Sequence, residues 1–96
     1  MAQSVIVVDK RDNVATALRH LEQGSSIRVE MEGFTIDVTL AQAIPLGHKF
    51  ALKDIEVGEP IIKYGEVIGL ATRKIKKGEH THVHNVEGLR GRGDRQ

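Results

Sequence analysis

The sequence predicts a mainly β domain with one short helix. Residues 27–31 and 34–40 each alternate apolar and polar side chains, and Gly33 stands between them. A period of two is typical of strands with one buried face, and glycine readily takes the positive φ of a tight turn. Beyond Pro45 the chain becomes a series of short apolar runs separated by glycine, which is typical of compact β folds.

Two elements precede this hairpin. Residues 4–8 are rich in valine and isoleucine and predict a buried strand. After Asp12, apolar residues recur at helical spacing, with Asp12 placed to cap a helix and Gly24 placed to end it. We therefore expect one amphipathic helix between these two positions, with an apolar stripe of Val14, Ala17, Leu18 and Leu21.

The second half predicts short strands within residues 49–52, 60–63, 66–72 and 80–85. Residues 55–59 are echoed by 75–79, each with an isoleucine, a glycine three positions later and then a glutamate. This pattern favours a repeated turn rather than a catalytic role for Glu59 or Glu79. Residues 87–96 contain glycine and arginine with almost no apolar side chains, so we expect a domain over 1–86 followed by a flexible basic tail.

Composition excludes several classes of function. The chain of 96 residues has no cysteine, a formal net charge of +1 and only 3% aromatic residues. A disulfide framework and a thiolate metal site are therefore excluded, and neither charge nor aromatic content favours nucleic acid. No segment approaches the roughly 18 apolar residues of a membrane span, so we expect a cytoplasmic protein without a membrane partner.

The histidines carry the main chemical pattern. On a strand, His80, His82 and His84 would project from one face about 6.5–7 Å apart. Such a row is compatible with three readings: the polar face of a half-exposed strand, ligands of a divalent metal, or an acid or base near neutral pH. His48 lies on a separate turn after Gly47. It can belong to the same site only if the fold brings it close to His80, His82 and His84. Arg90, Arg92 and Arg95 are candidates for binding a carboxylate.

Together these motifs resemble the N-terminal domain of altronate/galactarate dehydratases. The resemblance is clearest over residues 44–94 and rests on the order and spacing of its motifs. They are Gly47-His48-Lys49 with the preceding Pro45-Leu46, Ala51-Leu52-Lys53-Asp54-Ile55, Gly58-Glu59, Tyr64-Gly65, Ile68-Gly69, Gly78-Glu79-His80, His82-Val83-His84-Asn85 and Arg90-Gly91-Arg92-Gly93-Asp94.

The resemblance implies a β-clip fold of the SAF type and a small accessory subunit that completes the active site of a large catalytic lyase subunit. Two-subunit relatives of this kind include sulfolactate sulfo-lyases. The chemistry implied is loss of water or sulfite from a small hydroxy-acid, with a divalent metal such as iron held mainly by the partner.

The resemblance also implies roles for individual residues. His48, His82 and His84 would be catalytic, and Lys49 would bind substrate. Independently of the resemblance, we expect Arg90 and Arg92 to bind substrate, because arginine pairs with carboxylates. His80, His82 and His84 are the metal-ligand candidates on this chain. A free-standing sugar-acid binding module, a structural assembly domain and a homo-oligomer remain alternatives.

Overall fold

The computed structural model describes residues 4–31 and 33–88, and within these ranges it contains nine strands and no helix. The prediction of a mainly β domain is therefore confirmed. The strands are β1 Val5–Ile6, β2 Val14–Ala17, β3 Ser26–Met31, β4 Phe34–Thr39, β5 Lys49–Ala51, β6 Pro60–Lys63, β7 Glu66–Ala71, β8 His80–Thr81 and β9 Val86–Gly88.

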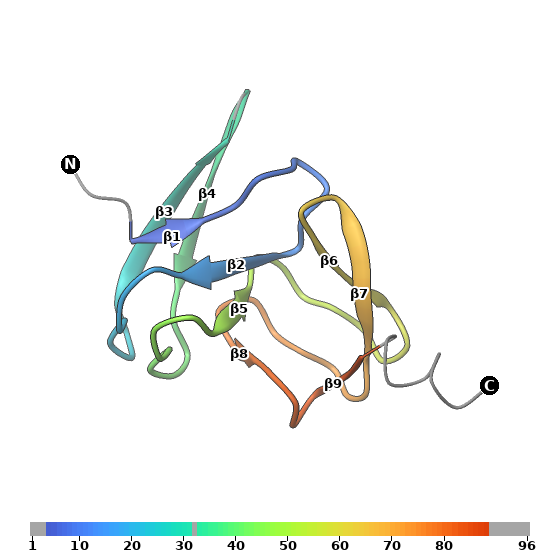
Figure 1. Ribbon diagram of the computed structural model, residues 1–96. Helices are drawn as coiled ribbons and strands as arrows, with labels where there is room; N and C mark the ends of the chain where they lie inside the picture. Colours follow the sequence, from blue (N-terminus) through green and yellow to red (C-terminus); the bar gives the residue numbers. More distant parts are fainter. Residues whose placement is uncertain (1–3, 32, 89–96) are drawn as a thin grey trace.

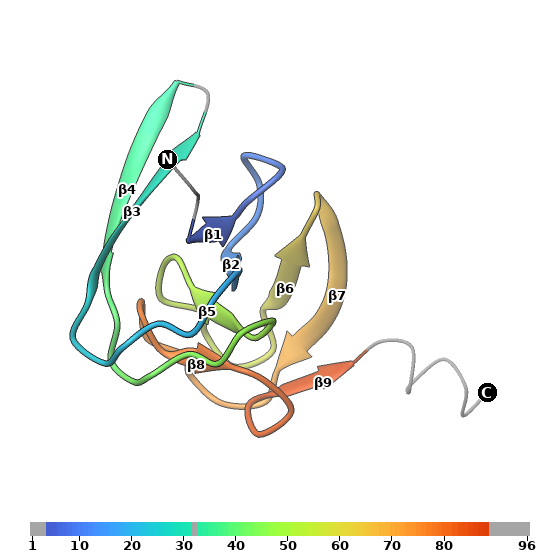
Figure 2. The ribbon, with the colours of Figure 1, turned by 60° about the vertical axis from the view of Figure 1, so that its left-hand side comes forward.

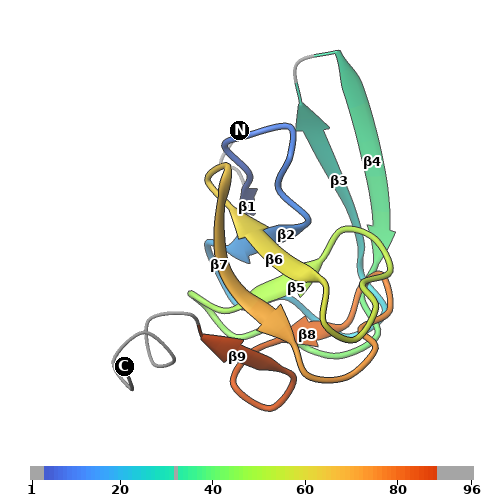
Figure 3. The same cartoon turned by 90° about the vertical axis from the view of Figure 1, so that its right-hand side faces the viewer.

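The strands form three antiparallel groups. A central sheet has the order β1-β2-β5-β8, and a second sheet has the order β6-β7-β9. The third group is the β3–β4 hairpin, which lies on one side of the central strands while β6, β7 and β9 lie on the other (Figures 1 and 2). Figure 3 shows the β6-β7-β9 side of the molecule turned toward the viewer.

The central strands separate two apolar cores. Ala15, Ala17 and Phe50 pack with the hairpin, whereas Val14 and Ala51 pack with β6, β7 and β9. Because both faces of β2 are covered, three of its four residues are buried and the strand shows no alternation of apolar and polar side chains. The central sheet therefore couples the two outer layers.

The hairpin follows the sequence prediction. Its register runs from Ser26 opposite Thr39 to Met31 opposite Phe34, and Gly33 has a φ of 92° in the connection. The inward face carries Ile27, Val29 and Val38, which are buried in the core with Leu40.

The predicted helix between Asp12 and Gly24 is wrong. Residues 14–17 form strand β2, Leu18 begins a bend and Leu21 forms a single β-bridge with Ile44. Gly24 does take a positive φ of 84°, but in a turn closed by a 3.1 Å hydrogen bond from the Ser25 amide to the Glu22 carbonyl. The apolar residues at helical spacing thus belong to a strand, a bend and a bridge, and the glycine predicted to end the helix belongs to a turn.

This eight-residue module occurs four times, at residues 17–24, 40–47, 51–58 and 71–78. Each module starts with alanine or leucine, has isoleucine or leucine four positions later and ends in glycine after three more. The four glycines, Gly24, Gly47, Gly58 and Gly78, have φ values of 84°, 85°, 84° and 90°. Positive φ at the third position of a turn favours glycine, which explains why the module ends on this residue.

The modules pair two by two through reciprocal hydrogen bonds. In the first pair the Gly24 amide donates to the Leu40 carbonyl and the Gly47 amide to the Ala17 carbonyl, at 2.8 and 2.9 Å. In the second pair, Gly58 and Gly78 make the equivalent bonds to Ala71 and Ala51. The similarity predicted between residues 55–59 and 75–79 is thus explained, because they belong to two of the four modules and these two modules pair with each other.

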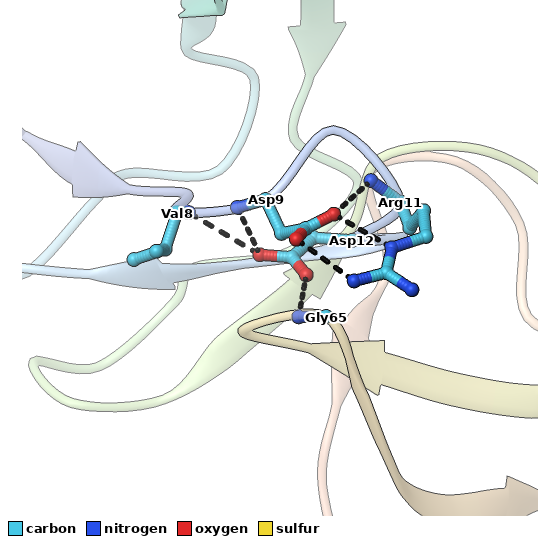
Figure 4. Close-up of polar contacts among 5 residues, drawn as sticks. All are labelled: Val8, Asp9, Arg11, Asp12 and Gly65. Atoms are coloured by element: carbon cyan, nitrogen blue, oxygen red, sulfur yellow. Dashed lines mark hydrogen bonds and ion pairs between the residues drawn. The ribbon is translucent and has the colours of Figure 1, made fainter.

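Asp12 organises the loop that leads into β2 (Figure 4). Its carboxylate, which is largely buried, accepts backbone hydrogen bonds from Val8 and Asp9 at 3.2 Å and from Gly65 at 2.8 Å. Beside it, Arg11 pairs with Asp9 and lowers the pKa of the Asp9 carboxyl to about 2, chiefly through a side-chain hydrogen bond. These contacts attach the tip of the β6–β7 hairpin to the loop between β1 and β2.

Candidate functional site

The histidines meet at the pairing of β5 with β8. Lys49 lies opposite Thr81 and Phe50 opposite His80 in this antiparallel register. Continuing the register by one residue places His48, which ends the Gly47 turn, opposite His82. Strand pairing therefore brings together histidines that are far apart in the sequence.

The predicted strand over residues 80–85 is correct only at its start, because β8 ends at Thr81. Asn85 is buried and closes a turn over the remaining residues. Its Oδ1 accepts from the His82 amide and its Nδ2 donates to the His80 carbonyl, both at 2.9 Å. This turn keeps His82 and His84 close to His80, so a continuous strand face is not what groups the three rings.

The imidazole rings form a connected cluster. His48 Nδ1 lies 2.8 Å from His80 Nε2, so one of these nitrogens carries the proton of a hydrogen bond between the rings. The His48 and His82 rings stack with centroids 4.2 Å apart, and the His80 and His82 rings stack with centroids 5.4 Å apart. His48, His80 and His82 therefore form a triangle, and the His84 ring lies 5.3 Å from that of His80.

Three of these rings have the arrangement of a metal site. One nitrogen each from His48, His80 and His82 lies within 4.8 Å of the other two. Three imidazole nitrogens suit zinc, iron, copper or nickel and leave further coordination positions for other ligands. The geometric trio thus contains His48 in place of the predicted His84, which contacts His80 but lies outside the trio. His48 was predicted as a catalytic residue, and the antiparallel register of β5 and β8 is what adds it to the candidate metal ligands.

Local electrostatics favour neutral rings. The pKa values of His80 and His82 are lowered, first by partial burial and then by the neighbouring histidines and Lys49. Neutral imidazole is the form that binds metal, so the environment keeps these nitrogens available near neutral pH.

Two hollows flank the cluster. One of about 200 Å³ lies beside Lys49 and His82. The other, of about 310 Å³, is lined by His80 and His84 together with Gln42 and Arg73. Sequence reasoning missed Gln42, whose side-chain oxygen accepts the His80 amide at 2.9 Å, because Gln42 precedes His80 by 38 residues.

The predicted basic tail is described only at its start, where Glu87 and Gly88 belong to β9. Arg90, Arg92 and Arg95 lie outside the described residues, so their predicted contacts stay predictions. In the part of the chain that the structure covers, no helix is long and apolar enough to cross a membrane.

Comparison with known proteins shows that the chain is similar to dehydratases and to a sulfo-lyase subunit. The family model described as "Altronate/galactarate dehydratase SAF domain" matches residues 3–89. The chain is 45% identical over 81 residues to the altronate dehydratase of Escherichia coli, covering 84% of this chain but 16% of that protein. It is also 45% identical over 53 residues to the (2R)-sulfolactate sulfo-lyase subunit alpha of Chromohalobacter salexigens, covering 55% of this chain and 56% of that subunit. Galactarate dehydratase (L-threo-forming) of Escherichia coli is 41% identical over 73 residues, which is 76% of this chain and 13% of that protein.

Proposed function

The chain belongs to the altronate/galactarate dehydratase SAF-domain family, and from this premise we propose that it is the small accessory subunit of a lyase. In this proposal it completes the active site of a separate large catalytic subunit that removes water from a small hydroxy-acid. The observation that carries the proposal is the cluster of His48, His80 and His82 beside the half-buried Lys49.

A relative that is named as a subunit supports a divided enzyme, whereas the dehydratases contain the matched region within a much longer protein. The match takes up 16% of altronate dehydratase and 13% of galactarate dehydratase. The sulfo-lyase relative, by contrast, is itself named as a subunit. The two hollows beside the histidines are open surface features rather than an enclosed pocket, which fits a site that a second protein covers.

Elimination from a hydroxy-acid needs three things: a base for the proton next to the carboxylate, an acid for the leaving group, and positive charge for the developing enolate. We assign Lys49, with Arg90 and Arg92, to binding the substrate carboxylate. His84 is exposed at one end of the cluster and is our candidate for proton transfer, a role that His48 and His82 share when they hold no metal.

A divalent metal fits the donor set. His48, His80 and His82 would hold it through neutral nitrogens, and the remaining ligands would come from the large subunit. A bound divalent metal such as iron would supply Lewis-acid stabilisation of negative charge on the substrate. The lowered pKa values of His80 and His82 support this assignment because protons compete less with the metal.

The test is co-expression of this chain with its large-subunit candidate, followed by elimination assays on altronate, galactarate and (2R)-sulfolactate. We expect activity in the pair and none in either chain alone. His82→Asn or His84→Asn in the pair should lower kcat/KM by about 100-fold or more, as expected for loss of acid-base or metal-binding groups. His20→Asn is the matched control, because His20 is exposed and pairs with Glu22 at 3.3 Å, away from the histidine cluster in the sequence. Full turnover in both site variants would contradict the assignment.

A further inference from the structure

The charge, walls and size of the hollow beside Lys49 indicate which class of ligand it binds. We propose that it binds the anionic head group of a short hydroxy-acid, a carboxylate or a sulfonate, and disfavours acids with a chain of hydroxyl groups. The inference rests on the proposed function in that it names the substrate class of the same site. Three observations carry it: an uncompensated ammonium, apolar walls and a small volume.

The ammonium of Lys49 forms no ion pair with the residues that the structure describes. The side chain is half-buried, and among residues 4–31 and 33–88 no carboxylate lies within ion-pair distance of it. Burying a charge without a partner is unfavourable, so a bound anion would offset this cost.

The walls of the hollow offer little to a hydroxyl group. Ile61, Ile68, Val83 and Val86 supply apolar surface. Thr81 also lines the hollow, but it is fully buried and its hydroxyl already donates to the Glu79 carbonyl at 3.3 Å. A substrate hydroxyl placed against these walls would lose water without gaining a hydrogen bond.

The size and position of the hollow complete the argument. Its volume of about 200 Å³ is smaller than the roughly 300–1,000 Å³ of pockets that enclose a whole ligand, so it accommodates a head group with few carbon atoms. His82 lines the same hollow. An acid anchored by Lys49 would therefore lie next to the imidazole cluster.

The inference can be tested on the isolated chain by nuclear magnetic resonance titration. The probes are lactate for the carboxylate, methanesulfonate for the sulfonate and gluconate for the hydroxyl-rich acids. We expect lactate or methanesulfonate to shift signals of Val83 and Val86, with gluconate binding at least tenfold more weakly. Shifts with lactate alone would identify a carboxylate site, and shifts with methanesulfonate alone a sulfonate site.

The matched variants are Lys49→Met, which keeps the apolar stem and removes the charge, and Lys53→Met at an exposed position nearby. Lys49→Met should weaken binding at least tenfold while Lys53→Met leaves it unchanged. Unaltered binding in Lys49→Met, gluconate binding as tight as lactate, or no response to either short acid would overturn the inference. Because the assay needs no turnover, selective binding by a chain whose pair lacks lyase activity would retain this site and reject the proposed function.

Discussion

Gly58 and Gly78 occupy the same position in paired modules but have different surroundings. Their φ values are 84° and 90°, so alanine is strained at both. An added Cβ at Gly58 would meet nothing within 4 Å, whereas at Gly78 it would overlap the backbone carbonyl oxygen of Thr39. Gly58→Ala therefore measures backbone strain alone, and Gly78→Ala measures strain together with the close approach of two chain segments.

The magnitudes follow from these contacts. Left-handed backbone costs alanine about 1–2 kcal/mol, which is partly offset by about 0.4–1 kcal/mol from a less flexible unfolded chain. Gly58→Ala should thus lower the free energy of unfolding by about 1 kcal/mol. At Gly78 the backbone must also move, which weakens the 2.9 Å bonds of its amide to Ala51 and of its carbonyl to Ala41. At about 0.5–1.5 kcal/mol per bond, Gly78→Ala should cost about 2 kcal/mol more than Gly58→Ala.

Thermal and urea unfolding would measure this difference. For a domain of this size, 1 kcal/mol corresponds to about 4–8 °C in Tm, so Gly78→Ala should melt at least about 8 °C below Gly58→Ala. Equal Tm values for the two variants would refute the argument that the approach of Gly78 to Thr39 is what demands glycine. Gly78 also precedes β8, so its variant should shift the His80 resonances, while Gly58→Ala should not.

Two further predictions concern charge. The lowered pKa values of His80 and His82 mean that the unfolded chain binds protons below the ordinary histidine pKa of 6.5 before the folded chain does. The metal-free chain should therefore lose stability as pH falls from 7.5 to 5.5, and urea unfolding should show a smaller loss in His82→Asn. Asp12→Asn should cost about 1–3 kcal/mol in urea unfolding, because the carboxylate accepts three part-buried backbone bonds through two oxygens and an amide keeps only one acceptor oxygen. The exposed Asp37→Asn is its control and should stay within about 0.5 kcal/mol of the parent chain.

The β3–β4 hairpin was predictable because its pattern is local. Alternating side chains select the buried face, and Gly33 supplies the turn, so no distant contact is needed. Phe34 is the exception, since the pattern predicts burial and the side chain is 42% exposed. Phe34 begins β4 directly after Gly33, and Figure 2 shows this end of the β3–β4 hairpin extending beyond the central strands.

The helix prediction failed for a different reason. The spacing from Ala17 to Leu21 to Gly24 fits a helix as well as it fits a bend, a bridge and a turn. Only the partner module at residues 40–47 decides between them, through the bridge of Leu21 to Ile44. Comparing the four modules with one another would have exposed the repeat, because four copies of one helix capped by glycine are implausible beside strands this short.

The histidine site was predictable in part. The sequence shows that His80, His82 and His84 are close together, but ring positions depend on the Asn85 turn and on the pairing of β5 with β8. His48 and Lys49 were predicted as site residues because of the family resemblance. In the structure, a hydrogen bond to His80 links His48 to the cluster. Gln42 was not predictable, since its contact with His80 depends on tertiary structure alone.

The two pairs of modules divide the chain into two halves, and the imidazole cluster lies on the boundary between them. His48 directly follows the first pair, residues 17–24 with 40–47, while His80 and His82 follow the second, 51–58 with 71–78. A metal held by these three rings would cross-link the halves and would bind only after they have docked. Its affinity would then include part of the free energy of assembling the domain, so metal release would loosen the fold at the surface that we propose for the large subunit.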